Sequence, residues 1–232
     1  MVIDEVLLID KPLGWTSFDV VGKIRSQLRT ATGQKIRVGH AGTLDPLAGG
    51  LLIVLLGQAT KRQDEFMKLD KVYEVEATLG QTSTTADAEG TKTQVSTKKK
   101  PTKAALKRAL KAFVGDIQQT PPIYSAIKVN GQRAYKLARS GKAVKLEPRN
   151  VTIHSLELTG YDYPKLSFTV HVSSGTYIRS LVSDLGEALE TGAYTSGLRR
   201  TRIGKFELEG ALSMGHITPE YLEKLCATAP EN

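Results

Sequence analysis

The sequence predicts an α+β fold with a mixed, mostly antiparallel sheet flanked by helices. Most strand candidates alternate apolar and polar residues, as half-buried antiparallel strands do. Two segments instead repeat apolar residues at helical spacing. Helix and strand candidates follow one another irregularly, which disfavours a parallel doubly wound sheet. No internal repeat or long linker interrupts the 232 residues.

The first elements are a strand and a helix. Residues 6–9 are typical of a short buried strand, and Asp10–Gly14 of a turn, because Pro12 fixes one backbone angle and Gly14 permits unusual ones. Thr16 or Ser17 can cap the helix that follows. Its apolar positions are predicted to be Phe18, Val21, Ile24 and Leu28.

The next segment is a glycine-rich loop, Gly39–Gly50, that leads into the apolar run Leu51–Leu56. Such a run fits a strand buried on both faces. Lys71–Leu79 alternates and predicts a half-buried strand, and the polar residues 81–100 predict a hairpin or loop.

The second half of the chain supplies the clearest helices. We expect helices at Thr102–Val114, Arg133–Ser140 and Tyr177–Glu190, strands at Val151–Leu158 and Leu166–Val172, and a strand pair within Leu198–Leu208.

Charge is concentrated in one segment. The net charge is +8, yet residues 98–149 hold fourteen Lys and Arg against two acids, which gives this segment +12. Such clustering favours a polyanionic partner, with nucleic acid the leading candidate. A solvated lysine-rich surface is the alternative.

Several function classes are disfavoured. Cys226 is the only cysteine, so an intramolecular disulfide is impossible, and no apolar run approaches a membrane span. No signal peptide is evident, so a cytoplasmic location is expected. Phosphate-loop, dinucleotide-binding and nucleophile-elbow motifs are missing, and the four histidines lack metal-ligand spacing, with His154 and His171 expected as ordinary strand residues. We therefore expect no cofactor and no metal.

The loop Gly39–Gly50 is the remaining candidate for chemistry. Its glycines let the backbone approach a ligand, and they place His40, Thr43 and Asp45 on a loop anchored by a strand. The alternative is a plain connection in which Asp45-Pro46 is only a turn. The residues alone leave both interpretations open.

Nine segments in collinear order resemble the TruB family of tRNA pseudouridine synthases. They are residues 11–17 (KPLGWTS), 38–48 (VGHAGTLDPLA), 57–61 (GQATK), 71–73 (KVY), 87–90 (DAEG), 121–126 (PPIYSA), 131–135 (GQRAY), 175–181 (GTYIRSL) and 198–201 (LRRT). The resemblance implies a pseudouridine synthase fold and an isomerase that converts uridine 55 in the T-arm of tRNA to pseudouridine without a cofactor. It implies tRNA as the partner, with no membrane and no protein partner, and a monomer is expected.

The resemblance also assigns roles to side chains. Asp45 is the essential carboxylate, which either attacks the ribose C1′ or removes a ribose proton, and the sequence does not choose between these roles. Arg179 pairs with this aspartate, and Tyr73 stacks on the uracil. His40 enters the T-loop near the position that the flipped base leaves, and Leu198 packs against the base. The alternatives are a surface arginine, a packed tyrosine, a loop histidine and a core leucine. Lys11 and Pro12 are read as support for the loop.

The resemblance divides the chain into a catalytic domain, residues 1–210, and a short tail, residues 211–232. A thumb-like insertion at about 122–149 is expected to close over the T-arm, with Lys136, Arg139 and Lys142 on phosphates. The tail is too short for the full PUA domain that many relatives carry. The sequence also departs from the family at Gly49-Gly50, where Thr-Gly is common, and at residues 203–205, where Ser-Gly-Pro is more usual.

Two other functions remain in view. One is a non-catalytic tRNA-binding or RNA-folding protein that retains the fold, which the charge pattern supports equally. The other is the guide-RNA-dependent dyskerin branch, which the short C-terminus disfavours.

Overall fold

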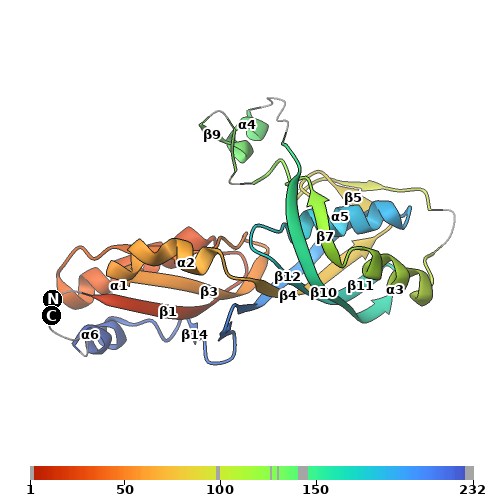
Figure 1. Ribbon diagram of the computed structural model, residues 1–232. Helices are drawn as coiled ribbons and strands as arrows, with labels where there is room; N and C mark the ends of the chain where they lie inside the picture. Colours follow the sequence, from red (N-terminus) through yellow and green to blue (C-terminus); the bar gives the residue numbers. More distant parts are fainter. Residues whose placement is uncertain (1–2, 98–99, 126, 130, 141–145, 228–232) are drawn as a thin grey trace. The chain divides into compact units, whose positions relative to one another are not determined.

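The computed structural model describes residues 3–97, 100–125, 127–129, 131–140 and 146–227. The chain forms two compact units, Met1–Tyr73 with Arg199–Asn232, and Glu74–Leu198, which are described separately. Figure 1 labels most of the helices and strands. No described helix has the length and apolar character needed to cross a membrane.

The main sheet is mixed and mostly antiparallel, which confirms the predicted fold class. Among the described residues it holds ten strands in the order β14-β1-β3-β12-β4-β11-β10-β7, with β2 on β3 and β13 on β12. Strands β1 (Asp4–Lys11) and β14 (Leu212–Ser213) pair in parallel.

In the first unit, β3 (Ala48–Gly57) is the central strand. It pairs antiparallel with β1, from Asp4 opposite Gly57 to Lys11 opposite Gly50, and with β2 (Val38–Ala41). Its alternate residues enter two separate core clusters, Leu52, Val54 and Leu56 in one, and Leu51, Ile53 and Leu55 in the other. The prediction of a strand buried on both faces is therefore confirmed.

Helix α1 (Ser17–Thr32) of the first unit begins with a capping box. The Asp19 backbone N–H donates to the Thr16 hydroxyl (3.1 Å), and the Thr16 N–H donates to the Asp19 carboxylate (2.7 Å). The buried face consists of Val20, Val21, Ile24 and Leu28. Phe18 was predicted on this face, and that prediction is wrong, since its side chain is 61% exposed.

Three further elements complete the first unit. The 3-10 helix η1 (Gln58–Arg62) and α2 (Gln63–Met67) follow β3, and α6 (Pro219–Ala227) packs on α1. Leu222 and Cys226 bring α6 into the α1 core.

The second unit includes two hairpins and the helices α3 and α5. Strand β10 (Arg149–Asp162) pairs with β11 (Lys165–Val172) and with β7 (Gly115–Gln119), and α3 (Lys103–Ala112) packs against β10 and α5 (Ile178–Ala188). The predicted apolar face of α5 is buried at Ile178, Leu181, Val182 and Leu185. The polar segment after β4 (Lys71–Leu79) forms the predicted hairpin, β5 (Gln81–Ser83) with β6 (Lys92–Gln94).

The remaining elements are the long strand β12 and several short ones. Strand β12 (Ala193–Ile203) pairs with β13 (Phe206–Glu207), as the sequence predicted for this part of the chain. The segment predicted as a thumb holds β8 (Lys128–Val129), β9 (Gln132–Arg133) and the predicted basic helix, α4 (Ala134–Arg139). Lys142 lies outside the described residues.

Candidate active site

The candidate carboxylate lies on a short loop between two paired strands. Strand β2 ends at Ala41 and β3 begins at Ala48, so the loop is shorter than predicted, and its two ends are strand instead. Within it the Ala48 N–H donates to the Asp45 carbonyl (3.0 Å), which closes a turn. The Asp45 side chain is half-buried.

Three hydrogen bonds attach this loop to the first residue of α1 and to the turn before it. The buried Ser17 hydroxyl donates to the Leu44 carbonyl (3.1 Å) and accepts from the Leu44 N–H (2.8 Å). The Gly14 N–H donates to the Pro46 carbonyl (2.8 Å). Both neighbours of Asp45 are therefore fixed in position.

Arg200 holds the loop from the other side. Its side chain is 1% exposed, and it donates from Nε to the Leu51 carbonyl (2.8 Å) and from Nη2 to the Gly42 carbonyl (3.0 Å). Gly50 has a φ of 97°, and a Cβ there would lie 2.3 Å from the Arg200 carbonyl oxygen. Glycine is required at position 50. Arg200 lies within a segment that matched the family, but sequence reasoning assigned it no role.

Lys11 is a buried cation beside the loop. Its Nζ donates to the carbonyls of Pro12 (3.0 Å) and Trp15 (2.5 Å). Burial lowers the pKa of Lys11 to about 8; the Asp45 carboxylate opposes this shift, and Arg200 adds to it. At neutral pH the ammonium is therefore still charged, and it contributes a positive field at Asp45.

His40 lies on β2, packed beneath Phe18. The two rings are 5.2 Å apart between centroids and perpendicular within 5° (85°), which is an edge-to-face contact. Burial, and then Arg200, lower the pKa of His40, so the neutral imidazole is favoured. Within the described part of the chain, the buried Nδ1 of His40 has no hydrogen-bond partner. The role of His40 in the RNA loop stays a prediction.

Tyr73 and Leu198 belong to strands of the main sheet. Tyr73 points inward from β4 and is 7% exposed, whereas Leu198 on β12 is half-buried. These positions suit either a base contact or ordinary packing, so both assigned roles remain predictions.

Arg179 lies in the first turn of α5 and is 6% exposed, which excludes the alternative of a surface arginine. Its Nη1 pairs with the Asp87 carboxylate (3.2 Å) and donates to the Thr85 carbonyl (3.0 Å), and its Nη2 donates to the Tyr124 carbonyl (2.8 Å). Asp87 is also buried, and it accepts from the Glu89 N–H (3.0 Å). Asp87 lies in a segment that resembles the family, but the sequence does not predict that it pairs with an arginine. Asp45 and Arg179 belong to different units, and their pairing stays a prediction.

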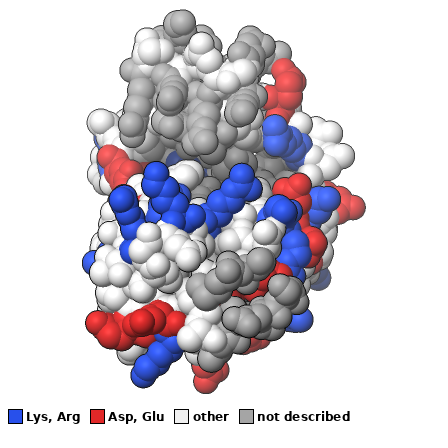
Figure 2. Space-filling view, turned by 90° about the vertical axis from the view of Figure 1, so that its left-hand side faces the viewer, with Lys and Arg blue, Asp and Glu red and all other residues white. Residues whose placement is uncertain are grey.

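Basic side chains gather on part of the surface. Figure 2 shows a band of Lys and Arg across the face that it presents. In the first unit, α1 carries exposed basic residues at Lys23, Arg25 and Arg29. In the second unit, the positions of Lys136 and Arg139 fall within α4, and their contact with phosphates stays a prediction.

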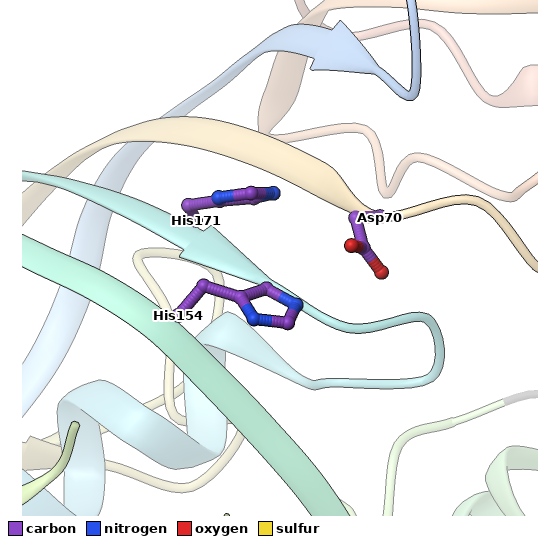
Figure 3. Close-up of side chains that lie close together, drawn as sticks. All are labelled: Asp70, His154 and His171. Carbon is purple, nitrogen blue, oxygen red and sulfur yellow. The ribbon is translucent and has the colours of Figure 1, made fainter. Parts of the chain in front are cut away.

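Two histidines that are distant in sequence lie together in the second unit, as Figure 3 shows. His171 on β11 is opposite Ser155, and the register shifts between Ile153 and Ser155, where His154 lies. The two rings are 4.6 Å apart. Two imidazoles are half of a tetrahedral zinc set. Asp70, the third residue drawn, belongs to the first unit, whereas both histidines belong to the second. The expectation of no metal site stays a prediction.

Family models identify the class of this fold and site. The model of the TruB family pseudouridylate synthase N-terminal domain matches residues 29–178. The model of the tRNA pseudouridylate synthase B C-terminal domain matches residues 179–228. The chain belongs to the TruB family of pseudouridylate synthases, which are isomerases.

Curated relatives extend over almost the whole chain. It is 47% identical over 221 residues to tRNA pseudouridine synthase B of Parabacteroides distasonis, covering 95% of this chain and 94% of the relative. It is 44% identical over 226 residues to tRNA pseudouridine synthase B of Thermobifida fusca, covering 94% of this chain and 75% of that relative.

Solved structures share the fold. A chain from a Cbf5-Nop10-Gar1 complex superposes with a TM-score of 0.71 at 29% identity, over 95% of this chain and 58% of its own length. A chain from an H/ACA RNP bound to a substrate RNA gives a TM-score of 0.68 at 26% identity, over 98% and 56%. This chain thus spans a little over half the length of those two.

Proposed function

We propose that this enzyme isomerises uridine 55 in the T-arm of tRNA to pseudouridine. The observation that carries the proposal is the near-full-length similarity to curated tRNA pseudouridine synthase B proteins. Their names favour catalysis over a purely RNA-binding role. The identity of 47% to these relatives, against 29% to the chain from the Cbf5-Nop10-Gar1 complex, favours a synthase that acts on tRNA.

Asp45 is the group that acts on the nucleoside. In the reaction the N1–C1′ bond breaks, the uracil turns, C5 bonds to C1′, the C5 hydrogen leaves as a proton, and N1 takes up a proton. A carboxylate can assist as a nucleophile at C1′ or as a base on the ribose. The Ser17 and Gly14 hydrogen bonds keep Asp45 in place, so less order has to be imposed when substrate binds.

The other assigned residues act on the base. Tyr73 stacks on the uracil, Leu198 packs against it, and His40 fills part of the space that the flipped base leaves. A neutral imidazole suits this role, because it costs less to desolvate among stacked bases than a charged one. Arg179 pairs with Asp45 while Asp87 holds its guanidinium.

Replacement of Asp45 by Asn tests the proposal. We expect Asp45→Asn to lower tritium release from tRNA labelled at uracil C5 by about 10⁴-fold or more. Binding of the tRNA should persist, since the amide keeps the shape of the side chain. Asp64→Asn on α2 is the control, an exposed carboxylate in the same unit, and it should retain full activity. Near-normal turnover by Asp45→Asn would refute the assignment.

The partner is tRNA, bound by a monomer in the cytoplasm, and the segment 122–149 supplies contacts to phosphates. Neutralising Lys136, Arg139 and Lys142 together should weaken tRNA binding and flatten its salt dependence, by up to about 0.9 in log–log slope per lost contact. An unchanged slope in a filter-binding titration would exclude these residues from the interface.

A further inference from the structure

Burial of apolar surface does not explain why position 18 holds a phenylalanine. Its ring is 61% exposed, although α1 has a complete buried face without it. An exposed aromatic ring at a fixed position is a frequent feature of surfaces that bind unstacked bases.

The position of Phe18 is fixed relative to the candidate carboxylate. It follows Ser17, whose hydroxyl holds both polar backbone groups of Leu44, and Leu44 precedes Asp45. The Phe18 ring contacts the His40 ring edge to face, with 5.2 Å between the ring centroids. Phe18, rather than the 9%-exposed His40, therefore presents the accessible aromatic surface beside this loop.

Phe18 begins a stripe along α1. Spacings of four, three and four residues lead from Phe18 to Gly22, Arg25 and Arg29, so the four lie on one side of the helix. All four are exposed. We call these four residues the α1 stripe. Arg25 also donates to the Val38 carbonyl (3.3 Å), which fixes the stripe to β2.

Gly22 is the informative member of the α1 stripe. Glycine in a helix interior is destabilising relative to alanine, and a close neighbour often explains it. Here a Cβ would meet nothing within 4 Å, so packing inside the chain does not require glycine. A bare backbone between an aromatic ring and two arginines leaves room for another chain to pass closely.

We propose that the α1 stripe binds substrate RNA, with an unpaired nucleobase stacked on Phe18, the sugar-phosphate backbone crossing Gly22, and phosphates on Arg25 and Arg29. This inference rests on the proposed function for the identity of the RNA. Stacking gives affinity at little cost in sequence preference, and arginine supplies charge and directed hydrogen bonds to phosphate.

The first test measures binding of a T-arm stem-loop RNA by fluorescence anisotropy. Phe18→Ala should raise Kd about 10- to 100-fold, and Phe18→Trp should restore it, because an indole also stacks. Met67→Ala is the control, since Met67 is an exposed apolar residue of the same unit, and it should bind as the unaltered protein does. A Kd for Phe18→Ala equal to that of the unaltered protein would overturn the proposal.

Abasic RNAs distinguish direct stacking from an effect through His40. If Phe18 stacks on a base, the loss caused by Phe18→Ala should disappear on one stem-loop that lacks that single base. If Phe18 only positions His40, the loss should persist on every abasic RNA and disappear in a His40→Ala background. The second pattern would overturn the proposal.

Gly22 provides a test in which stability and binding move in opposite directions. Gly22→Gln should raise Tm, because glutamine favours a helix, and should weaken RNA binding, because the side chain blocks the path. Thr30→Gln, on another side of α1, is the control and should leave binding unchanged. Unchanged binding by Gly22→Gln would show that RNA does not cross there.

Failure of this inference is separable from failure of the proposed function. An unaltered protein that binds the stem-loop in a Phe18-dependent way but releases no tritium refutes the function and keeps the α1 stripe. Full tritium release together with normal binding by Phe18→Ala refutes the α1 stripe alone.

Discussion

Arg200 and Arg179 are both buried, one in each unit, but they meet different partners. Arg200 donates to two main-chain carbonyls, and within the described part of the chain it forms no salt bridge. Arg179 also donates to two carbonyls, but it pairs in addition with the buried carboxylate of Asp87. The charge of Arg179 is compensated locally, whereas that of Arg200 extends to its neighbours.

The pKa values of three groups near Arg200 reflect its uncompensated charge. After the larger effect of burial, Arg200 lowers the pKa values of Lys11, His40 and Lys71. The two arginines therefore do different work. Arg200 ties Gly42 and Leu51 together and leaves a positive field around the Asp45 loop, while Arg179 is held in one orientation by its own counterion.

Removing the counterion should have the largest effect. Asp87→Asn removes the carboxylate that pairs with the buried Arg179 guanidinium inside its own unit, and we expect a loss of about 3–5 kcal/mol in the free energy of unfolding. Asp4→Asn is the matched control, because it breaks the exposed Arg62–Asp4 pair (2.8 Å) and should cost less than about 1 kcal/mol. Equal losses in urea unfolding would contradict the contrast drawn between the two arginines.

Arg200→Met should have the next largest effect. It leaves the carbonyls of Gly42 and Leu51 unpaired, which we expect to cost about 2–4 kcal/mol in unfolding free energy and to lower kcat, because the loop loses an anchor. Arg199→Met on the same strand is the control, since Arg199 is half exposed and pairs with Asp10 (2.9 Å). If both substitutions lower kcat equally, anchoring of the loop by Arg200 is not what matters.

The smallest effect concerns pH. Burial lowers the pKa of Lys11 and of Lys71 to about 8, so between pH 8 and 10.5 the unfolded chain holds more protons than the folded one. The unfolding free energy should therefore rise with pH in this window, by at most about 1.4 kcal/mol per pH unit for each lysine. Lys11→Met should reduce the slope, measured by urea unfolding between pH 7.5 and 9.5.

Arg200→Met should also reduce that slope, because the pKa values of both lysines would rise toward their ordinary value. Lys23→Met, which removes an exposed lysine of α1, should leave the slope unchanged. If the unfolding free energy depends on pH equally with and without Arg200, the charge of Arg200 is compensated locally.

The sequence predicted elements whose pattern reports burial directly. The run Leu51–Leu56 and the spacing of Ile178, Leu181, Val182 and Leu185 led to the observed strand and helix, because apolar periodicity follows from the faces that are buried. The same reasoning gave a wrong prediction for Phe18, because an apolar residue next to a helical pattern is assigned to the buried face of the helix even when it is exposed.

The site was predicted less completely than the fold. Family resemblance pointed to Asp45, Tyr73 and Arg179 as individual residues, but it carried no information on what holds them. Asp87 and Arg200 act through contacts more than 90 residues distant in sequence, such as Arg179 with Asp87 and Arg200 with Gly42. The pairing of His154 with His171 depends on a register shift within a hairpin, which spacing does not reveal.

The register of β1 on β3 limits where this chain can change in length. Lys11 is opposite Gly50, and Gly50 has no space for a side chain beside Arg200. One residue inserted near Ala48 would move every side chain of β3 to the opposite face, and so toward the other of its two core clusters. Between α1 and β2, residues 33–35 are exposed, whereas Ile36 packs against the core cluster of Leu52, Val54 and Leu56, and the Arg37 carbonyl accepts from the Gly57 N–H (2.8 Å). A change in length at residues 33–35 should therefore disturb the geometry around Asp45 least.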